Sequence, residues 1–125
     1  MGEEENRRTA ERMWELLGNR DWDGMRALLA DDYVEEWPQS GERIRGRDNA
    51  LAINANYPGL PTATIRRTLA GGDIVVAEVT LDYHGHVYNA VSIFEFRDGK
   101  IARETDYFAE PFEAPGWRAQ WVERT

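Results

Sequence analysis

The chain has 125 residues, no cysteine, and 23 acidic against 15 basic side chains, which gives a formal net charge of −8 at pH 7. A chain of this length fits one domain, here residues 1–125, with a core that needs no disulfides. The negative charge opposes binding to phosphate backbones and to anionic membranes, so we expect neither nucleic acid nor membrane as a partner. The acidic N-terminus lacks the apolar run of a secretory signal or membrane anchor, and we expect a cytoplasmic protein.

The first part of the chain predicts helices. Residues 3–17 carry apolar side chains at helical spacing and form an amphipathic helix. Asp21 is the predicted N-cap of a second, shorter helix over residues 22–29. Residues 33–37 are a first strand, which Pro38 stops.

The second part of the chain predicts a sheet. A third helix over residues 47–57 leads into a strand at residues 62–69. Segment 72–108 then alternates apolar side chains over most of its length, which is typical of three antiparallel strands joined by tight turns. Residues 110–125 carry two Trp residues four positions apart and predict a short helix folded back onto the body. Helices followed by an antiparallel sheet define an α+β fold.

Three motifs carry a resemblance to a known family. DDYVEEWP at residues 31–38, GERIRGRD at 41–48 and FEFRDGKI at 94–101, with this order of elements, resemble the nuclear-transport-factor-two-like superfamily and, within it, the SnoaL-like (polyketide cyclase-like) proteins. The resemblance implies a cone-shaped curved antiparallel sheet wrapped around the N-terminal helices, as in cystatin-like α+β barrels. It also implies a homodimer through the outer sheet face. Family members include isomerases, cyclases, dehydratases, epoxide hydrolases and non-catalytic binding modules.

The chain departs from the ketosteroid isomerases of that superfamily. Where those enzymes have a catalytic Asp before the Pro, a Tyr on a helix and an oxyanion Asp, this chain has Trp37, Met13 and Ser92. A base and two hydrogen-bond donors are therefore missing, and ketosteroid isomerisation is not expected.

Asp106 is the principal catalytic candidate. It lies in a segment that resembles the position of the acidic residue in SnoaL-like cyclases and limonene-epoxide-hydrolase-like members. An aromatic pocket disfavours the charged form of a carboxylate, which raises its pKa toward the range of general acid and base catalysis. The alternative is a structural Asp, hydrogen-bonded to Trp, Tyr or Arg in the wall.

A second carboxylate comes from the first strand, where Glu35 and Glu36 are adjacent and only one can face inward. The family register favours Glu35, and two carboxyls in one cavity could divide into a protonated acid and an ionised base. The alternative is a surface ion pair with Arg43 or Arg45.

His86 is the third catalytic candidate, because a neutral imidazole could orient Asp106 or shuttle a proton. It follows a turn, so it could instead lie at the rim in water. His84 and His86 lack a third metal ligand at a nearby spacing, and no metal and no cofactor are predicted.

Aromatic residues make up 11% of the chain, more than a core requires, and suit a pocket for a small hydrophobic or aromatic molecule. The predicted substrate-binding residues are Trp14, Tyr33, Trp37, Asn54, Tyr57, Tyr88, Ser92 and Phe108. The leading hypothesis is cofactor-independent acid/base catalysis. Its rivals are a non-catalytic binding module and a dimeric scaffold whose cavity is filled by Trp14, Trp37 and Trp117.

Overall fold

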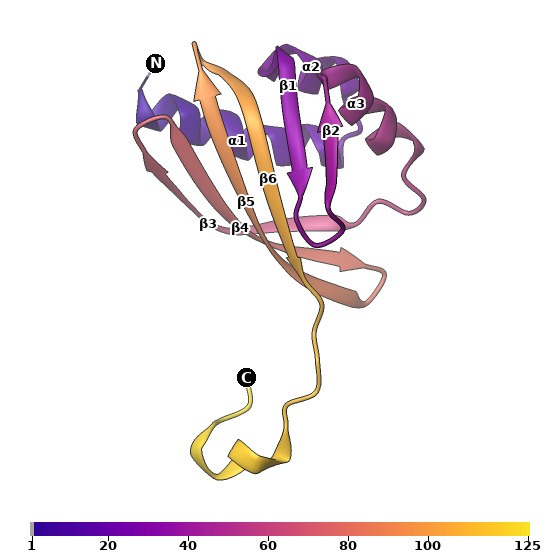
Figure 1. The fold of residues 1–125 in the computed structure, drawn as a ribbon, viewed down its shortest axis with the longest axis vertical. Coiled ribbons are helices and arrows are strands. Elements are labelled where there is room, and N and C mark those ends of the chain that lie inside the picture. Colours follow the sequence, from indigo (N-terminus) through magenta and orange to yellow (C-terminus); the bar gives the residue numbers. More distant parts are fainter. Residues whose placement is uncertain (1) are drawn as a thin grey trace.

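A computed structural model describes residues 2–125 and shows helices beside a curved sheet (Figure 1). The helices are α1 (Glu3–Gly18), α2 (Trp22–Leu28), α3 (Arg47–Asn56) and the short 3-10 helix η1 (Gly116–Trp121). The strands are β1 (Leu29–Trp37), β2 (Glu42–Arg45), β3 (Thr62–Gly71), β4 (Ile74–Tyr83), β5 (His86–Arg97) and β6 (Lys100–Ala109). No helix within the described residues has the length and apolar character needed to cross a bilayer.

The sheet has six strands in the order β2-β1-β6-β5-β4-β3 and does not close, so β2 and β3 are its edges. Helix α1 packs against β3 and β4, and α3 packs against β1 (Figure 1). The expected α+β class, with a curved sheet around N-terminal helices, is confirmed. One pairing departs from the expected antiparallel arrangement, because β1 and β6 pair in parallel.

The first strand is longer than predicted and has a partner that the sequence did not reveal. β1 begins at Leu29, and its register on β6 shifts between Leu29 and Val34, which breaks the alternation used to predict strands. β2 pairs antiparallel with β1, but only Ile44 of its four residues is buried. One apolar position is too short a pattern to distinguish a strand from a turn.

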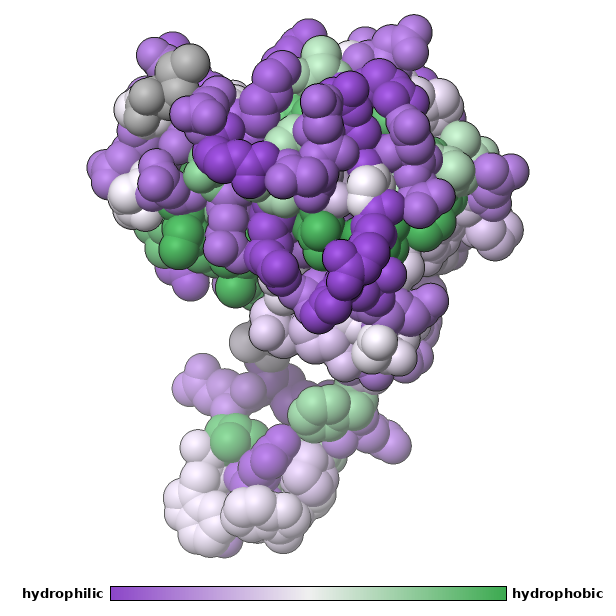
Figure 2. Space-filling model, turned by 45° about the horizontal axis from the view of Figure 1, so that its top comes forward, coloured by the Kyte–Doolittle hydropathy of each residue, from purple (hydrophilic) through white to green (hydrophobic). Residues whose placement is uncertain are grey.

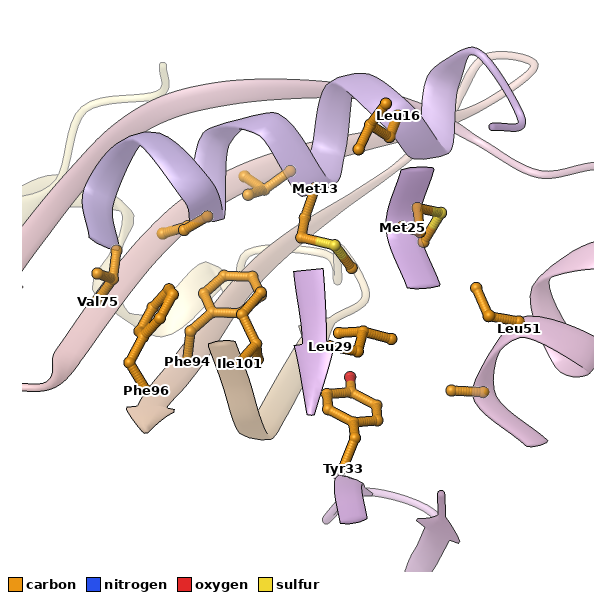
Figure 3. Packing of buried hydrophobic residues seen from close by; sticks show 14 of the residues in the cluster. Met13, Leu16, Met25, Leu29, Tyr33, Leu51, Val75, Phe94, Phe96 and Ile101 are labelled. Carbon is orange, nitrogen blue, oxygen red and sulfur yellow. The ribbon is translucent and has the colours of Figure 1, made fainter. Parts of the chain in front are cut away.

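The core lies between α1 and the inner face of the sheet. Apolar residues at helical spacing put Ala10, Met13 and Leu16 on the buried side of α1. Met13 points toward Phe94 and Ile101, which β5 and β6 contribute from below (Figure 3). Burial of this apolar surface is the main term that holds α1 on the sheet.

The C-terminal segment corrects a further prediction. Residues 110–125, here called the C-terminal arm, extend away from the body instead of folding back onto it (Figure 1). Trp117 and Trp121 are 73% and 72% exposed. Pro111 and Pro115 fall in the stretch before η1, and Pro115 has extended backbone angles, φ −67° and ψ 142°. Proline disfavours a helical residue before it, so this stretch stays extended.

Candidate functional site

A cavity of about 520 Å³ lies between the sheet and the helices. Ten of the residues predicted for the site line it: Trp14, Tyr33, Glu35, Trp37, Asn54, Tyr57, His86, Tyr88, Asp106 and Phe108. Ser92 is buried behind this wall and is not among the lining residues. The remaining lining residues are mainly apolar and include Met13, Leu29, Leu51 and Phe94.

Strand alternation and register bring three carboxyl groups together on the wall. On β1, Tyr33 and Glu35 lie on one face, and the parallel register sets Glu35 opposite Glu104 of β6. Two residues further along β6, Asp106 lies opposite Ser92 of β5. Carboxyl oxygens of Glu35, Glu104 and Asp106 lie within 4.8 Å of one another, and all three residues are buried.

Tyr33 links the two glutamates. Its hydroxyl lies 3.0 Å from Glu35 Oε1 and 2.9 Å from Glu104 Oε1. The Tyr33 side chain is almost wholly buried, and burial together with the three neighbouring carboxyls raises its pKa well above the usual range. The phenol therefore stays protonated and acts as a hydrogen-bond donor within the cluster.

Trp37 and Ser92 complete the network around Asp106. The Trp37 indole N–H donates to Glu35 Oε2 and to Asp106 Oδ2, both at 3.0 Å. Ser92 Oγ donates to Asp106 Oδ1 at 2.6 Å. Asp106 thus accepts two hydrogen bonds, and the one from Ser92 is not shared with another carboxyl. Hydrogen bonds of this kind stabilise negative charge on a carboxylate.

The described part of the chain supplies no cationic partner for the cluster. Within residues 2–125, no Lys, Arg or His forms a salt bridge with Glu35, Glu104 or Asp106. Burial first, and then the neighbouring carboxyls, raise the pKa of Glu35 and of Glu104 well above their usual range. Burial in this cluster therefore favours the protonated form of both glutamates.

The choice between Glu35 and Glu36 is settled by the fold. Glu35 faces the cavity, whereas Glu36 lies on the outer side of β1 and pairs with Arg43 and Arg103. The ion pair considered for Glu35 is thus made by its neighbour.

His86 lies at the cavity mouth. Its imidazole is more than half exposed, with Nε2 3.2 Å from Glu110 Oε1 and its ring against Tyr88. The structure therefore brings Glu35 and Asp106 together and leaves His86 outside their hydrogen-bond network.

Glu104 was not among the predicted site residues, although the alternation of β6 puts it on the same face as Asp106. Glu104 is a charged residue two positions before Asp106, so both lie on the strand face that turns toward the core. A charged residue on such a face is the sequence signal that could have identified it. Its proximity to Glu35 depends on the pairing of β1 with β6, which a local pattern does not reveal.

The three carboxyls also form a group that could hold a metal ion. Both oxygens of Glu35 and both of Asp106 already accept hydrogen bonds from Tyr33, Trp37 or Ser92. Coordination of a cation would compete with these bonds, and the donor set fits protonated or shared-proton carboxyls better than a metal centre.

Aromatic side chains line the route from the cluster to the mouth. Phe108 stacks edge-on against Trp37, and Tyr88 stacks edge-on against Tyr83. The Tyr57 and Tyr83 hydroxyls lie 3.3 Å apart. Partial burial, with the Tyr57 hydroxyl as the next cause, raises the pKa of Tyr83. The entrance is thus aromatic, with polar hydroxyl groups at its edge.

A curved open sheet that encloses an apolar cavity with polar groups on its wall defines a protein of the NTF2-like class. The SnoaL-like domain family matches residues 10–104 of this chain. The chain belongs to that family. No curated protein shows significant similarity to it.

Comparison with solved structures also places the chain in the NTF2-like class. An NTF2-like protein of unknown function from Burkholderia xenovorans LB400 is 41% identical, with a TM-score of 0.86, over 98% of this chain and 97% of that chain. A candidate ketosteroid isomerase from Kribbella flavida DSM 17836 is 37% identical, with a TM-score of 0.92, over 98% and 90%. An LEH-like epoxide hydrolase from M. tuberculosis is 31% identical, with a TM-score of 0.72, over 83% and 82%.

Proposed function

We propose that this protein is an enzyme that carries out acid/base catalysis, without a cofactor, on a small hydrophobic or aromatic substrate held in the cavity. One observation supports this function above all: three buried carboxyls share a few neutral donors on the wall of an apolar cavity. Buried carboxyls without cationic partners are costly for stability, and such arrangements cluster at functional sites.

The two carboxyls that share the Trp37 indole N–H would act as the acid and the base. Asp106, held by Ser92 and Trp37, is the base that takes a proton from a substrate carbon or from water. Glu35, protonated because burial raises its pKa, is the acid that donates to a substrate oxygen. The proton passes back between them through the shared cluster at the end of the cycle, so no external acid or base is consumed.

Charge and shape restrict the substrate. An anionic group beside the three carboxyls would meet like charge in a low-dielectric site, so the reacting part of the substrate is neutral. The apolar wall and the aromatic entrance suit a flat or terpenoid-sized body with one or two oxygens. The M. tuberculosis epoxide hydrolase relative favours addition of water to an epoxide as the first reaction to assay.

A non-catalytic binding module would use the same cavity. The buried Trp14 indole N–H, which has no hydrogen-bond partner among the described residues, is compatible with either function. The filled-cavity scaffold is less well supported, since Trp117 lies on the exposed arm and the cavity is open.

The first experiment is a thermal-shift screen against epoxides, hydroxylated aromatics and polycyclic ketones, each also assayed for turnover. A neutral ligand at about 100 times its dissociation constant should stabilise the fold by roughly 2.7 kcal/mol, a shift of several degrees. No shift in any class would argue against a ligand pocket.

Asp106→Asn separates an enzyme from a binding module. The change is nearly isosteric, so we expect ligand binding and the melting temperature to stay close to wild type, while turnover falls by at least about 100-fold because the base is lost. Glu42→Gln, an exposed carboxyl on β2, is the matched control and should leave turnover unchanged. Unchanged turnover in Asp106→Asn would rule out Asp106 as the base.

A further inference from the structure

Glu104 is the carboxyl of the cluster to which the proposed acid and base give no role. It is 8% exposed, and its side chain lines the cavity together with Glu35 and Asp106. Each oxygen of those two residues contacts a hydroxyl or indole donor at hydrogen-bond distance. Glu104 Oε1 accepts from the Tyr33 hydroxyl, but no described residue donates a hydrogen bond to Glu104 Oε2. This oxygen is therefore left to bind a ligand in the cavity.

The charge of Glu104 is not balanced by the polar exterior of the protein. Hydrophilic side chains cover most of the body in the view of Figure 2. Among them, Arg43 and Arg103 pair with Glu36 on the outer side of β1. A bound proton, instead of an ion pair, is thus what neutralises the enclosed Glu104 carboxyl, and burial raises its pKa in that direction.

The donors around the two glutamates determine which oxygen carries a proton. The Trp37 indole N–H only donates, so Glu35 Oε2 is an acceptor and a proton on Glu35 lies on Oε1, toward Tyr33. The Tyr33 hydroxyl accepts from Glu35 and donates its own proton to Glu104 Oε1 at 2.9 Å. Glu104 Oε1 is then also an acceptor, and a proton on Glu104 lies on Oε2. The three groups form a proton-transfer chain that ends at the cavity.

We propose that Glu104 is a further catalytic residue, whose Oε2–H binds a neutral acceptor oxygen of the substrate, as in a ketone or an epoxide, and delivers to it the proton of Glu35. This inference rests on the proposed function. The substrate oxygen takes the proton of Glu104 Oε2, Glu104 Oε1 takes the phenol proton of Tyr33, and Tyr33 takes the proton of Glu35 Oε1. One proton thus leaves Glu35 and one reaches the substrate. Glu104 and Tyr33 remain neutral, and the proton that Asp106 has taken restores Glu35.

A matched pair of probes tests the hydrogen bond without any turnover. 2-Acetylnaphthalene offers a carbonyl oxygen, and 2-isopropenylnaphthalene has a CH₂ group of similar size in its place. Wild type should bind the ketone at least about tenfold more tightly than the alkene, as expected for one buried hydrogen bond. The infrared C=O stretching frequency of the bound ketone should also fall, which a merely structural role of Glu104 would not cause.

Two substitutions separate the donor from the rest of the side chain. Glu104→Gln keeps an N–H donor in place of Oε2–H, because the amide oxygen accepts from Tyr33, so the preference for the ketone should remain. Glu104→Leu removes the donor and should abolish both the preference and the infrared shift. Glu42→Gln is the control and should match wild type. A wild type that binds neither probe or both equally, or an infrared shift that persists in Glu104→Leu, would overturn the proposal.

A kinetic measurement tests proton delivery separately from binding, and it depends on Glu104→Gln alone. With a substrate from the thermal-shift screen, this variant should lower kcat at least about 100-fold and leave KM within about threefold of wild type, because an amide donates a hydrogen bond but transfers no proton. A wild-type kcat in Glu104→Gln, with turnover lost in Asp106→Asn, would overturn this proposal and leave the proposed function intact. Absence of turnover for every ligand that binds would instead reject the proposed function, and proton delivery with it.

Discussion

Tyr33 holds one proton between two carboxyl oxygens at hydrogen-bond distance. A phenol donates only one hydrogen bond, so a close contact to both Glu35 and Glu104 requires that one of them donates a proton in return. This arrangement favours a protonated glutamate in the cluster, the same direction as the raised pKa values of Glu35 and Glu104. Tyr33 and its two glutamate partners therefore retain protons in addition to forming part of the cavity wall.

Tyr33→Phe tests that role. Loss of the hydroxyl leaves two buried carboxyls without their shared donor, and we expect the free energy of unfolding at pH 7 to fall by about 1–3 kcal/mol. The measurement is urea denaturation followed by circular dichroism. Tyr107→Phe, which removes a half-exposed hydroxyl on the outer face, is the control and should change stability by less than about 0.5 kcal/mol. Equal effects of the two changes would contradict a structural role for the Tyr33 hydroxyl.

At the level of elements, the pairing of β1 with β6 sets Glu35 directly opposite Glu104. Like charges at opposite positions of two strands destabilise a sheet, so bound protons on this pair stabilise the pairing of β1 with β6. Burial raises the pKa of both glutamates above the ordinary value of a glutamate, about 4.3, so the folded state binds more protons than the unfolded state above that pH. The free energy of unfolding must then fall as pH rises through this range.

The dependence of the free energy of unfolding on pH can be tested by substituting the two glutamates. From about pH 4.5 upward, wild type should lose stability by at most about 1.4 kcal/mol per pH unit for each retained proton. Glu35→Gln with Glu104→Gln removes the titration, so the stability of the double variant relative to wild type should rise with pH. Denaturation at a series of pH values measures the difference in free energy of unfolding between the double variant and wild type, with Glu42→Gln as the control variant. A difference that does not change with pH would show that neither glutamate retains a proton.

At the scale of the whole molecule, the sheet has one face toward the cavity and an opposite, outer face, through which the family resemblance implies a homodimer. The same alternation that turns Asp106 toward the cavity turns Tyr107 outward. A substitution on the outer face therefore tests assembly without changing the lining of the cavity.

Ile93→Lys tests the homodimer through the outer sheet face that the family resemblance implies. Ile93 lies on β5 next to Phe94, which faces the cavity, so its own side chain lies on the outer face. A charge there would be buried without a partner in such a dimer, so we expect a monomer in light scattering, with ligand-induced thermal shifts retained. Val91→Lys should behave in the same way. Ala52→Lys, exposed on α3, is the control and should leave the assembly state of wild type unchanged. A variant that remains dimeric would place the interface elsewhere.

Much of the site followed from local pattern. Alternation along residues 33–37 and along the last strand of segment 72–108 indicates which side chains share a face, and the family resemblance predicts which face points inward. Tyr33, Glu35 and Asp106 line the cavity as expected. Face assignment needs only neighbours in sequence, so a single sequence contains it. The family resemblance supplied the register that favoured Glu35 over Glu36.

Other features depend on contacts between distant segments. The parallel pairing of β1 with β6 joins residues far apart in sequence and makes Glu104 part of the site. The position of His86 at the mouth and the outward course of the arm also depend on how elements meet. Thus the sequence by itself determined the fold class, the faces of the strands and the candidate carboxylates, because periodicity is local. Only the tertiary structure decided which carboxyls share protons and which surfaces stay uncovered, because those properties arise from packing between elements.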